Sequence, residues 1–536
     1  MSRSLSPHLV RRHLRTAVLG VVSLAAVSAL PAGALGASGT STDAPLVVRT
    51  AGGLVQGAAQ SGDRVFQGIP YAAPPTGGGR WQPPQPAASW SGVRAATQAG
   101  NECVQQAIFW RPGSPASWHE DCLYLNVWTP RHINGNLPVL VWFHGGGFVN
   151  GAGTDVQPQR LTTWGNNIVV TVNYRLGAMG YLALPQLDAE SSDGSSSGNY
   201  GMLDQQAALR WVQGNIAAFG GNARDVTIAG QSAGAGSVCY QLASPTAAGL
   251  FQRAIVQSGL DCIIVSHSTG VSRGATFATK LGCTDSAMVT SCLRSKTPAQ
   301  VIAAQAGMSW NPAVGGASQP LAPLDAYRSG AFNQVPVILG NTRHEVRAFV
   351  YEGNDLVQQP LTAEGYVAAI QSSFGANAGK VLAEYPLSAY SAPGIALAAV
   401  QTDQGFACPT LPIVAALSQR VRTYGYEFRD ETSPLRPYMV IPPSFPIGSG
   451  HTSDVPYVWQ SSTMTPLTST QLRLSSLMIA YWSKFARAGD PNGATRPTWP
   501  RIGPHDLRLG LLTAGQTQVI TDYSQEHHCG FWQSMA

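Results

Sequence analysis

The sequence predicts an α/β protein whose central sheet is mostly parallel and is covered by helices on both faces. Short apolar and β-branched runs, typical of buried strands, recur along the chain, and stretches with helical periodicity separate them. This alternation favours a parallel sheet with a helical layer on each side. A helix is expected at residues 201–219. The expected strands lie within residues 45–56, 64–68, 123–128, 138–143, 167–174, 226–229, 253–257, 335–339 and 424–428.

The length and charge of the chain limit its organisation and its partners. The chain has 536 residues, of which 11% are charged, and its formal net charge is +5. No long basic run occurs, which argues against a nucleic-acid partner. A chain of this length would favour about three domains, but no internal repeat and no convincing linker between domains is visible.

The N-terminal segment has the pattern of a secretory signal. Arginines precede a short apolar core at residues 17–30, Pro31 follows at once, and small residues suited to cleavage end at Gly36. The core is shorter than the ~20 residues of a membrane span, which argues against the alternative of an uncleaved anchor. The sequence therefore predicts a signal peptide over residues 1–36, a secreted protein and no stable membrane anchor.

The eight cysteines of the chain follow the predicted signal, and in a secreted protein they are expected to pair. Cys103 with Cys122 and Cys283 with Cys292 could each close a small loop, but the spacings do not fix the connectivity. No cysteine or histidine spacing indicates zinc, so we expect no metal.

Ser232, the serine of a G-x-S-x-G pattern, is the predicted nucleophile. The strand expected at 226–229 leads into Gly230–Gly234, and a helix can continue through residues 238–242. A sharp strand-to-helix turn needs small neighbours, lifts the hydroxyl clear of the sheet and lets the next N–H face a bound oxyanion. The alternative is a Gly/Ser turn without chemistry, which the flanking strand and helix disfavour.

Three glycines after the strand expected at 138–143 form a candidate oxyanion hole. Residues 144–148 have the sequence HGGGF, so the backbone must approach something closely there. An oxyanion hole needs N–H donors aimed at one point with no side chain in the way. A β-bulge or a loose turn is the alternative, and the serine turn makes it less favourable.

His451 is the predicted base. A serine hydroxyl is a weak nucleophile until a neighbouring base takes its proton. In α/β-hydrolases the triad runs in the order serine, acid, histidine. His451 lies in a glycine-flanked loop after the strand at 424–428, the last clear strand expected. His527 and His528 also lie late in the chain, but we expect them at the surface.

Glu345 is the predicted acid. It follows the strand expected at 335–339 across a short turn at residues 340–342, and it precedes His451. The alternative is that Glu345 is a solvated loop carboxylate. The other carboxylates considered lie one strand too late or in expected helix or loop: Asp430, Glu431, Asp325 and Asp403.

These motifs resemble the type-B carboxylesterases, a family of α/β-hydrolases that includes bacterial carboxylesterases such as para-nitrobenzyl esterase, fungal lipases and cholinesterases. Residues 219–234 match the serine signature of that family, and residues 120–127 match its second signature. Shorter matches lie at residues 67–72, 144–148, 199–201, 257–259 and 527–532. The resemblance extends from about residue 45 to the C-terminus. It implies an α/β-hydrolase fold with a single catalytic domain over residues 37–536.

The resemblance also implies the roles of the site residues. It makes Ser232 the nucleophile, Glu345 the acid and His451 the base. The implied oxyanion-hole donors are the N–H groups of Gly146, Gly147 and Ala233.

Three disulfides follow from the same resemblance, and two cysteines are left over. The implied pairs are Cys103–Cys122, Cys283–Cys292 and Cys408–Cys529. Whether Cys239 and Cys262 pair stays open. The chain departs from the family pattern at Val346 and Asn222, where glycine and aspartate are usual.

The sequence therefore predicts a secreted serine carboxylesterase that hydrolyses small-molecule esters with neutral, short-to-medium acyl groups and needs no cofactor. The natural ester and the oligomeric state stay open. A non-catalytic adhesion or binding member of the same fold is the alternative, which the complete triad disfavours. Phe109, Trp110 and Trp118 are expected to line an apolar pocket or pack on the sheet rather than bind a quaternary ammonium group.

Overall fold

The computed structural model describes residues 44–133, 135–191, 197–259, 262, 264–460, 465–503, 508–511 and 517–535. The chain divides into residues 1–42 and a compact unit of residues 43–536. The signal peptide predicted at residues 1–36 lies outside the described residues.

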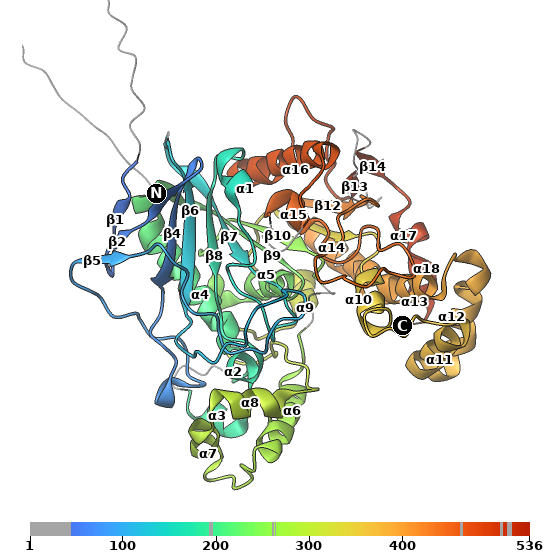
Figure 1. The fold of residues 1–536 in the computed structure, drawn as a ribbon, viewed down its shortest axis with the longest axis horizontal. Coiled ribbons are helices and arrows are strands. Elements are labelled where there is room, and N and C mark those ends of the chain that lie inside the picture. The colour runs from blue at the N-terminus through green and yellow to red at the C-terminus, as the bar shows by residue number, and fades with distance from the viewer. Residues whose placement is uncertain are drawn as a thin grey trace, which may run out of the picture. The chain divides into compact units, whose positions relative to one another are not determined.

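The strands form two sheets (Figure 1). The strands are β1 (Val47–Thr50), β2 (Gly53–Gln56), β3 (Ala58–Gln60), β4 (Asp63–Pro70), β5 (Val93–Ala95), β6 (Tyr124–Pro130), β7 (Leu137–Phe143), β8 (Ile168–Val172), β9 (Gly221–Gln231), β10 (Arg253–Gln257), β11 (Val337–Thr342), β12 (Thr423–Phe428), β13 (Arg508–Leu511) and β14 (Gln518–Ile520). The large sheet has the order β14-β13-β12-β11-β10-β9-β7-β8-β6-β4-β3, and the small one β1-β2-β5. Neighbours from β8 to β13 are all parallel, and the outer pairs are antiparallel.

Helices connect the parallel strands, and the predicted α/β class is confirmed. The helices are α1 (Gln159–Thr163), α2 (Gly177–Tyr181), α3 (Pro185–Ala189), α4 (Tyr200–Asn215), α5 (Ala233–Ala243), α6 (His267–Lys280), α7 (Val289–Ser295), α8 (Pro298–Gln305), α9 (Pro323–Ser329), α10 (Arg347–Gly353), α11 (Ala363–Phe374), α12 (Ala378–Glu384), α13 (Pro393–Thr402), α14 (Thr410–Ser418), α15 (Val455–Val458), α16 (Ser469–Ala488), α17 (Tyr523–Glu526) and α18 (Cys529–Ser534).

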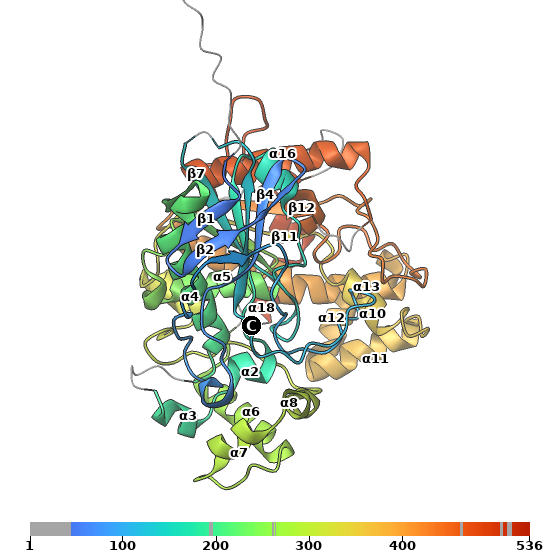
Figure 2. The same cartoon turned by 60° about the vertical axis from the view of Figure 1, so that its left-hand side comes forward.

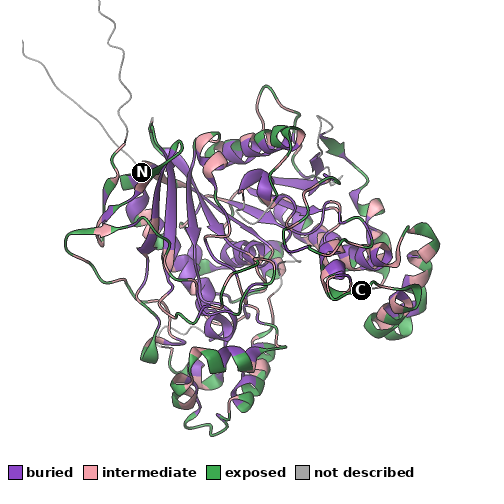
Figure 3. Cartoon of the chain, in the orientation of Figure 1, coloured by how far each residue is buried: buried purple, intermediate pink, exposed green. Residues whose placement is uncertain are grey.

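The two faces of the large sheet are buried against different helices. Along β7, Val141 and Phe143 belong to an apolar cluster that includes α4 and α5. Leu140 and Trp142 belong to a second cluster that includes α16. Because side chains alternate across a strand, α4 and α5 cover one face and α16 covers the other (Figure 2). Figure 3 shows the strands buried between these layers, which explains their continuous apolar sequences.

The sequence of α16 explains where this long covering helix starts and stops. Thr468 caps its first turn, and the side chain of Gln471 reaches back to the Thr468 backbone to complete a capping box. Gly489 ends the helix in the left-handed conformation, with φ of 63°. Between these signals, the spacing of Leu474, Met478 and Phe485 directs apolar side chains to the sheet.

Two features of the sheet differ from the sequence prediction. The prediction of a turn at residues 340–342 is wrong, because these residues continue β11 and pair with β12. The expectation that 424–428 is the last clear strand is also wrong, because β13 and β14 extend the sheet beyond it. The β13 sequence RLGL contains no β-branched residue, so it gives a weak strand signal.

A separate helical unit lies on the chain between the predicted acid and the predicted base. Helices α10, α11, α12 and α13 share an apolar cluster with residues 438–447 and lie together in Figure 1. The unit begins directly after Glu345, and residues 438–447 lead to His451. The packing of this unit therefore helps to position the loops that contain Glu345 and His451.

Four disulfides cross-link the described residues. The pairs are Cys103–Cys122, Cys239–Cys262, Cys283–Cys292 and Cys408–Cys529. The three pairs implied by the family resemblance are among them. The fourth joins Cys239 and Cys262, whose pairing the sequence left open.

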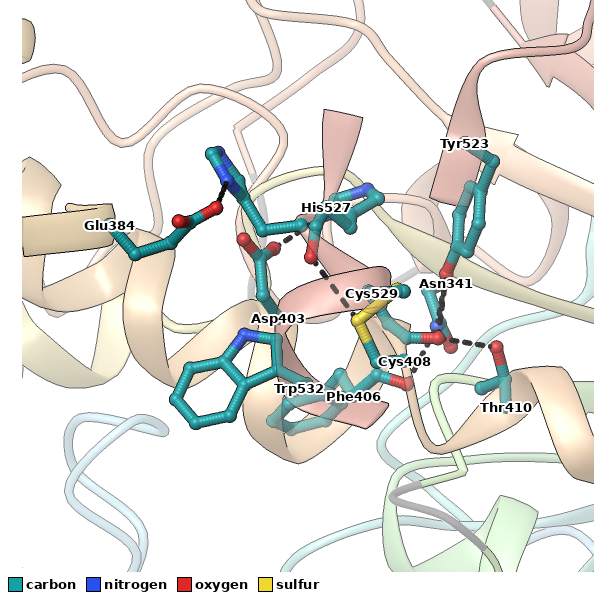
Figure 4. The surroundings of a disulfide bond; sticks show 12 residues. Asn341, Glu384, Asp403, Phe406, Cys408, Thr410, Tyr523, His527, Cys529 and Trp532 are labelled. Atoms are coloured by element: carbon teal, nitrogen blue, oxygen red, sulfur yellow. Dashed lines mark hydrogen bonds and ion pairs between the residues drawn. A yellow bond between two sulfur atoms is a disulfide. The ribbon is translucent and has the colours of Figure 1, made fainter. Parts of the chain in front are cut away.

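His527 lies buried beside the Cys408–Cys529 disulfide, so the expectation of a surface position for this residue is wrong (Figure 4). Its Nδ1 lies 2.6 Å from a carboxylate oxygen of Asp403, and its Nε2 lies 2.6 Å from one of Glu427. Burial would lower the pKa of His527, but the hydrogen bonds and charges of the two carboxylates outweigh it and raise the pKa to about 10. A charged imidazole thus ties Asp403, the residue that follows α13, to β12.

We predict that the His527 contacts stabilise the fold most below neutral pH. The folded pKa is above the ordinary value of 6.5, so the contribution is complete below that value and is lost as pH rises through about 10. His527→Gln should therefore lower Tm more at about pH 6 than at about pH 10. His528→Gln is the matched control, since that half-exposed neighbour contacts one carboxylate, on Glu384. An equal loss of Tm at both pH values would contradict this account.

Candidate active site

Ser232 stands at a strained junction between β9 and α5. Its φ of 57° and ψ of −124° are unusual for a residue with a side chain. The turn closes only around glycines: a Cβ on Gly230 would lie 2.2 Å from the carbonyl oxygen of Gly234. A Cβ on Gly234 would lie 2.0 Å from the carbonyl oxygen of Phe143 on β7. This geometry holds the serine at the carboxyl end of the parallel strands, as the sequence predicts.

Glu345 and His451 are in direct contact. Nδ1 of His451 lies 2.5 Å from Oε2 of Glu345, whose side chain is fully buried. The other carboxylate oxygen accepts a 2.7 Å hydrogen bond from the N–H of Thr342 at the end of β11. The buried carboxylate therefore fixes the imidazole with Nδ1 as the donor.

Backbone hydrogen bonds join the two loops that carry this pair. The N–H of His451 donates to the carbonyl of Glu345 at 3.0 Å, and the N–H of His344 donates to Ser449 at 3.1 Å. The family departure at Val346 causes no strain, because its φ is −92°. Its N–H donates to the Thr402 hydroxyl at 3.1 Å.

Gln231, the residue before the candidate nucleophile, contacts Nε2 of His451, the ring nitrogen that Glu345 does not bind. Its amide nitrogen lies 3.0 Å from Nε2 of His451, and its side chain is buried. Among the described residues, the Ser232 hydroxyl has no hydrogen-bond partner. The amide therefore occupies the lone pair that a base for Ser232 would need. Gln231 is not among the predicted site residues, although it lies inside the serine pattern, next to the predicted nucleophile.

The glycine loop after β7 offers unpaired backbone donors. Gly146 has φ of 109° and Gly147 of 61°, and a Cβ on Gly146 would lie 2.1 Å from the carbonyl oxygen of Asn150. Within the described ranges, the N–H groups of Gly146, Gly147 and Ala233 have no hydrogen-bond partner. Such donors could stabilise an oxyanion formed at Ser232.

His144 supports the glycine loop as a neutral residue. Burial lowers the pKa of His144 to about 4, and its ring stacks on Tyr174 with the centroids 4.3 Å apart. The Tyr174 hydroxyl donates to the carbonyl of His144 at 2.6 Å. The start of the loop is therefore held without a charge.

A pocket of about 360 Å³ opens above Ser232 and His451. Its walls are mainly aromatic and aliphatic, which suits the apolar part of a small molecule. The apolar lining residues are Phe109, Trp110, Trp142, Val156, Ala348, Phe349 and Val455. Trp118 is not among the lining residues, and 45% of it is exposed. The pocket also contains three charged side chains, those of Asp155, Glu352 and Arg436.

Metal ligands and membrane spans can be assessed for the described residues only. In those ranges, no group of three His, Cys, Asp or Glu residues could hold a metal ion. None of the helices described there is long and apolar enough to cross a membrane.

Comparisons with known proteins point to one family. The carboxylesterase family model matches residues 44–532. The chain is 33% identical over 505 residues to a cocaine esterase of Homo sapiens, covering 89% of this chain and 88% of that protein. It is 34% identical over 482 residues to the pyrethroid hydrolase Ces2a of Mus musculus, covering 85% and 84%. It is 32% identical over 493 residues to a fumonisin B1 esterase of Sphingopyxis macrogoltabida, covering 88% and 87%.

We predict that Gln231→Glu moves the acid limb of the kcat/KM profile to higher pH, by about one unit. A carboxylate next to Nε2 would favour the protonated imidazole and so disfavour the base form. Gln231→Met keeps a side chain of similar length and removes the amide donor without adding a charge, so its acid limb should move less than that of the glutamate variant. The profiles are measured on one uncharged p-nitrophenyl ester. Identical acid limbs for the glutamate variant and the wild type would contradict the contact between residue 231 and His451.

Proposed function

The chain belongs to the carboxylesterase family and is a carboxylic ester hydrolase, and from this premise we propose that it is a secreted serine esterase with Ser232, Glu345 and His451 as its triad. The observation that carries the proposal is the 2.5 Å contact between His451 Nδ1 and the buried carboxylate of Glu345, beside a pocket that contains Ser232.

The proposed reaction has two half-reactions through an acyl-enzyme. The imidazole leaves the Gln231 amide, and His451 Nε2 takes the proton as Ser232 Oγ attacks the ester carbonyl. The carboxylate of Glu345 stabilises the imidazolium. His451 then gives the proton to the leaving oxygen, the bond to the alcohol breaks, and the acyl group stays on Ser232. In the second half-reaction, water attacks the acyl carbonyl while His451 takes a proton from it. His451 then returns the proton to Ser232 Oγ as the bond between Oγ and the acyl group breaks, and the carboxylic acid leaves.

Gly146, Gly147 and Ala233 complete the proposal as oxyanion-hole donors. Their N–H groups lack partners among the described residues; Gly146 and Gly147 line the pocket, and Ala233 directly follows Ser232. Each would donate to the negative oxygen of the tetrahedral intermediate, where loss of one donor costs about 10²–10³ in kcat.

We propose neutral, short-to-medium acyl esters as substrates. The mainly apolar pocket of about 360 Å³ supports a small neutral acyl group. Apolar walls distinguish acyl lengths weakly, by about 1–3 kcal/mol per methylene, so we expect a broad acyl range.

Secretion is also part of the proposal. Four disulfides support an oxidising compartment. The N-terminal sequence pattern supports export.

We predict that Ser232→Ala loses activity on p-nitrophenyl butyrate by about 10⁴–10⁶ in kcat and keeps the Tm of the wild type within a few degrees. The control is Ser258→Ala. Ser258 directly follows the neighbouring strand β10 and has φ of 56°, but it does not line the pocket, so this variant should keep most of the activity. Retention of more than about a hundredth of the activity in Ser232→Ala would show that another group is the nucleophile.

A further inference from the structure

Two of the three charged side chains in the catalytic pocket already have strong partners. Asp155 accepts a 2.8 Å bond from Nη1 of Arg111 through one oxygen and a 2.8 Å bond from the N–H of Ala152 through the other. One carboxylate oxygen of Glu352 accepts from the Tyr438 hydroxyl. Asp155 is thus paired with a guanidinium, and Glu352 is hydrogen-bonded to a neutral hydroxyl.

Arg436 differs from both acids. Its Nη2 donates to the backbone carbonyl of His451. Among the described residues, no second hydrogen bond reaches the guanidinium, and no carboxylate lies within the ion-pair distance of about 4 Å. A guanidinium has N–H donors on all of its nitrogens. Arg436 therefore presents several unused donors to a mainly apolar pocket.

We propose that Arg436 forms a subsite for a carboxylate on the alcohol part of the ester. This inference rests on the proposed esterase function and extends its substrates from neutral esters to esters of hydroxy acids. The planar guanidinium fits a carboxylate with two parallel hydrogen bonds. In such an ester the acyl group is uncharged, and the negative charge is carried by the alcohol part.

The position of Arg436 places the subsite on the alcohol side. His451 gives its proton to the leaving oxygen, so the alcohol lies next to the imidazole when the bond breaks. Arg436 is bonded to the backbone of that same residue. The glycine loop proposed to hold the oxyanion belongs to a different segment of the lining, directly after β7.

Aromatic side chains near Arg436 favour an aromatic hydroxy acid. The ring of Phe349 lies 5.0 Å from the ring of His451. The ring of Phe109 lies 5.5 Å, edge to face, from that of Tyr438, which also bonds Glu352. Phe109 and Phe349 are 53% and 42% exposed, so both offer ring surface to an aryl group.

Glu352 limits the charge that the subsite accepts. The pKa of Glu352 is raised by burial, while the Tyr438 hydroxyl and the positive charge of Arg436 oppose the rise. Arg436 interacts electrostatically with Glu352, so an anion bound to Arg436 would be repelled by the Glu352 carboxylate. A singly charged carboxylate is therefore favoured over a doubly charged phosphate.

The test compares para-butyryloxybenzoate with its uncharged isostere, para-butyryloxybenzamide. The ratio of their kcat/KM values is measured at about pH 8, where carboxylates are ionised. Because both esters use the same triad, the ratio cancels any general damage to catalysis. Arg436→Gln should lower the ratio about tenfold, mainly through a higher KM for the benzoate, because the contact is made in both ground and transition states. Arg436→Lys should restore part of the ratio, and Glu352→Gln should raise it.

Three results would overturn the subsite. The ratio could stay within about twofold of the wild type in Arg436→Gln. It could fall in Glu352→Gln. Arg436→Gln could also affect an acyl-side carboxylate, in p-nitrophenyl hydrogen succinate, more than the benzoate. Lack of activity on both butyryl esters in the wild type would instead contradict the proposed esterase function itself.

Discussion

The contact between Glu345 and His451 is the interaction on which the candidate site depends, because it joins loops that are 106 residues apart in sequence. A buried carboxylate is unfavourable without partners, and Glu345 accepts hydrogen bonds from both the His451 imidazole and the N–H of Thr342. The same anion orients the neutral imidazole and would stabilise the imidazolium formed as a serine loses its proton. One contact thus serves both folding and the proposed chemistry.

The scaffold behind this contact is held by a second set of long-range bonds. Thr402 accepts from the N–H of Val346, next to the acid, and Asp403 bonds His527. His527 in turn reaches Glu427 on β12, the strand that precedes the His451 loop. The helical unit α10–α13 is therefore tied at its end to the sheet that carries the candidate triad residues, and the loops of the candidate acid and base are hydrogen-bonded to each other.

The sequence predicts best the features that a few adjacent residues determine. The turn at Ser232 and the glycine loop at 144–148 are both recognisable because close backbone approach permits only glycine or other small residues. The parallel sheet follows from continuous apolar strands. The surface position expected for His527 is wrong because its sequence neighbours are polar, whereas its burial depends on partners 124 and 100 residues away. Gln231 lies inside the serine pattern, but neither its local sequence nor that of Arg436 reveals the contact with His451, which arises only when the loop of His451 folds against them.

The central claim is that Glu345 activates Ser232 through His451, and the rate of fluorophosphonate labelling tests it most directly. Peptide mapping of the labelled wild type should find the adduct on Ser232. Glu345→Gln keeps the side-chain shape but removes the charge and favours the wrong imidazole tautomer, so labelling should slow by about 10³–10⁴ in a variant that remains folded. An adduct on a different residue, or an unchanged labelling rate in folded Glu345→Gln, would contradict the account.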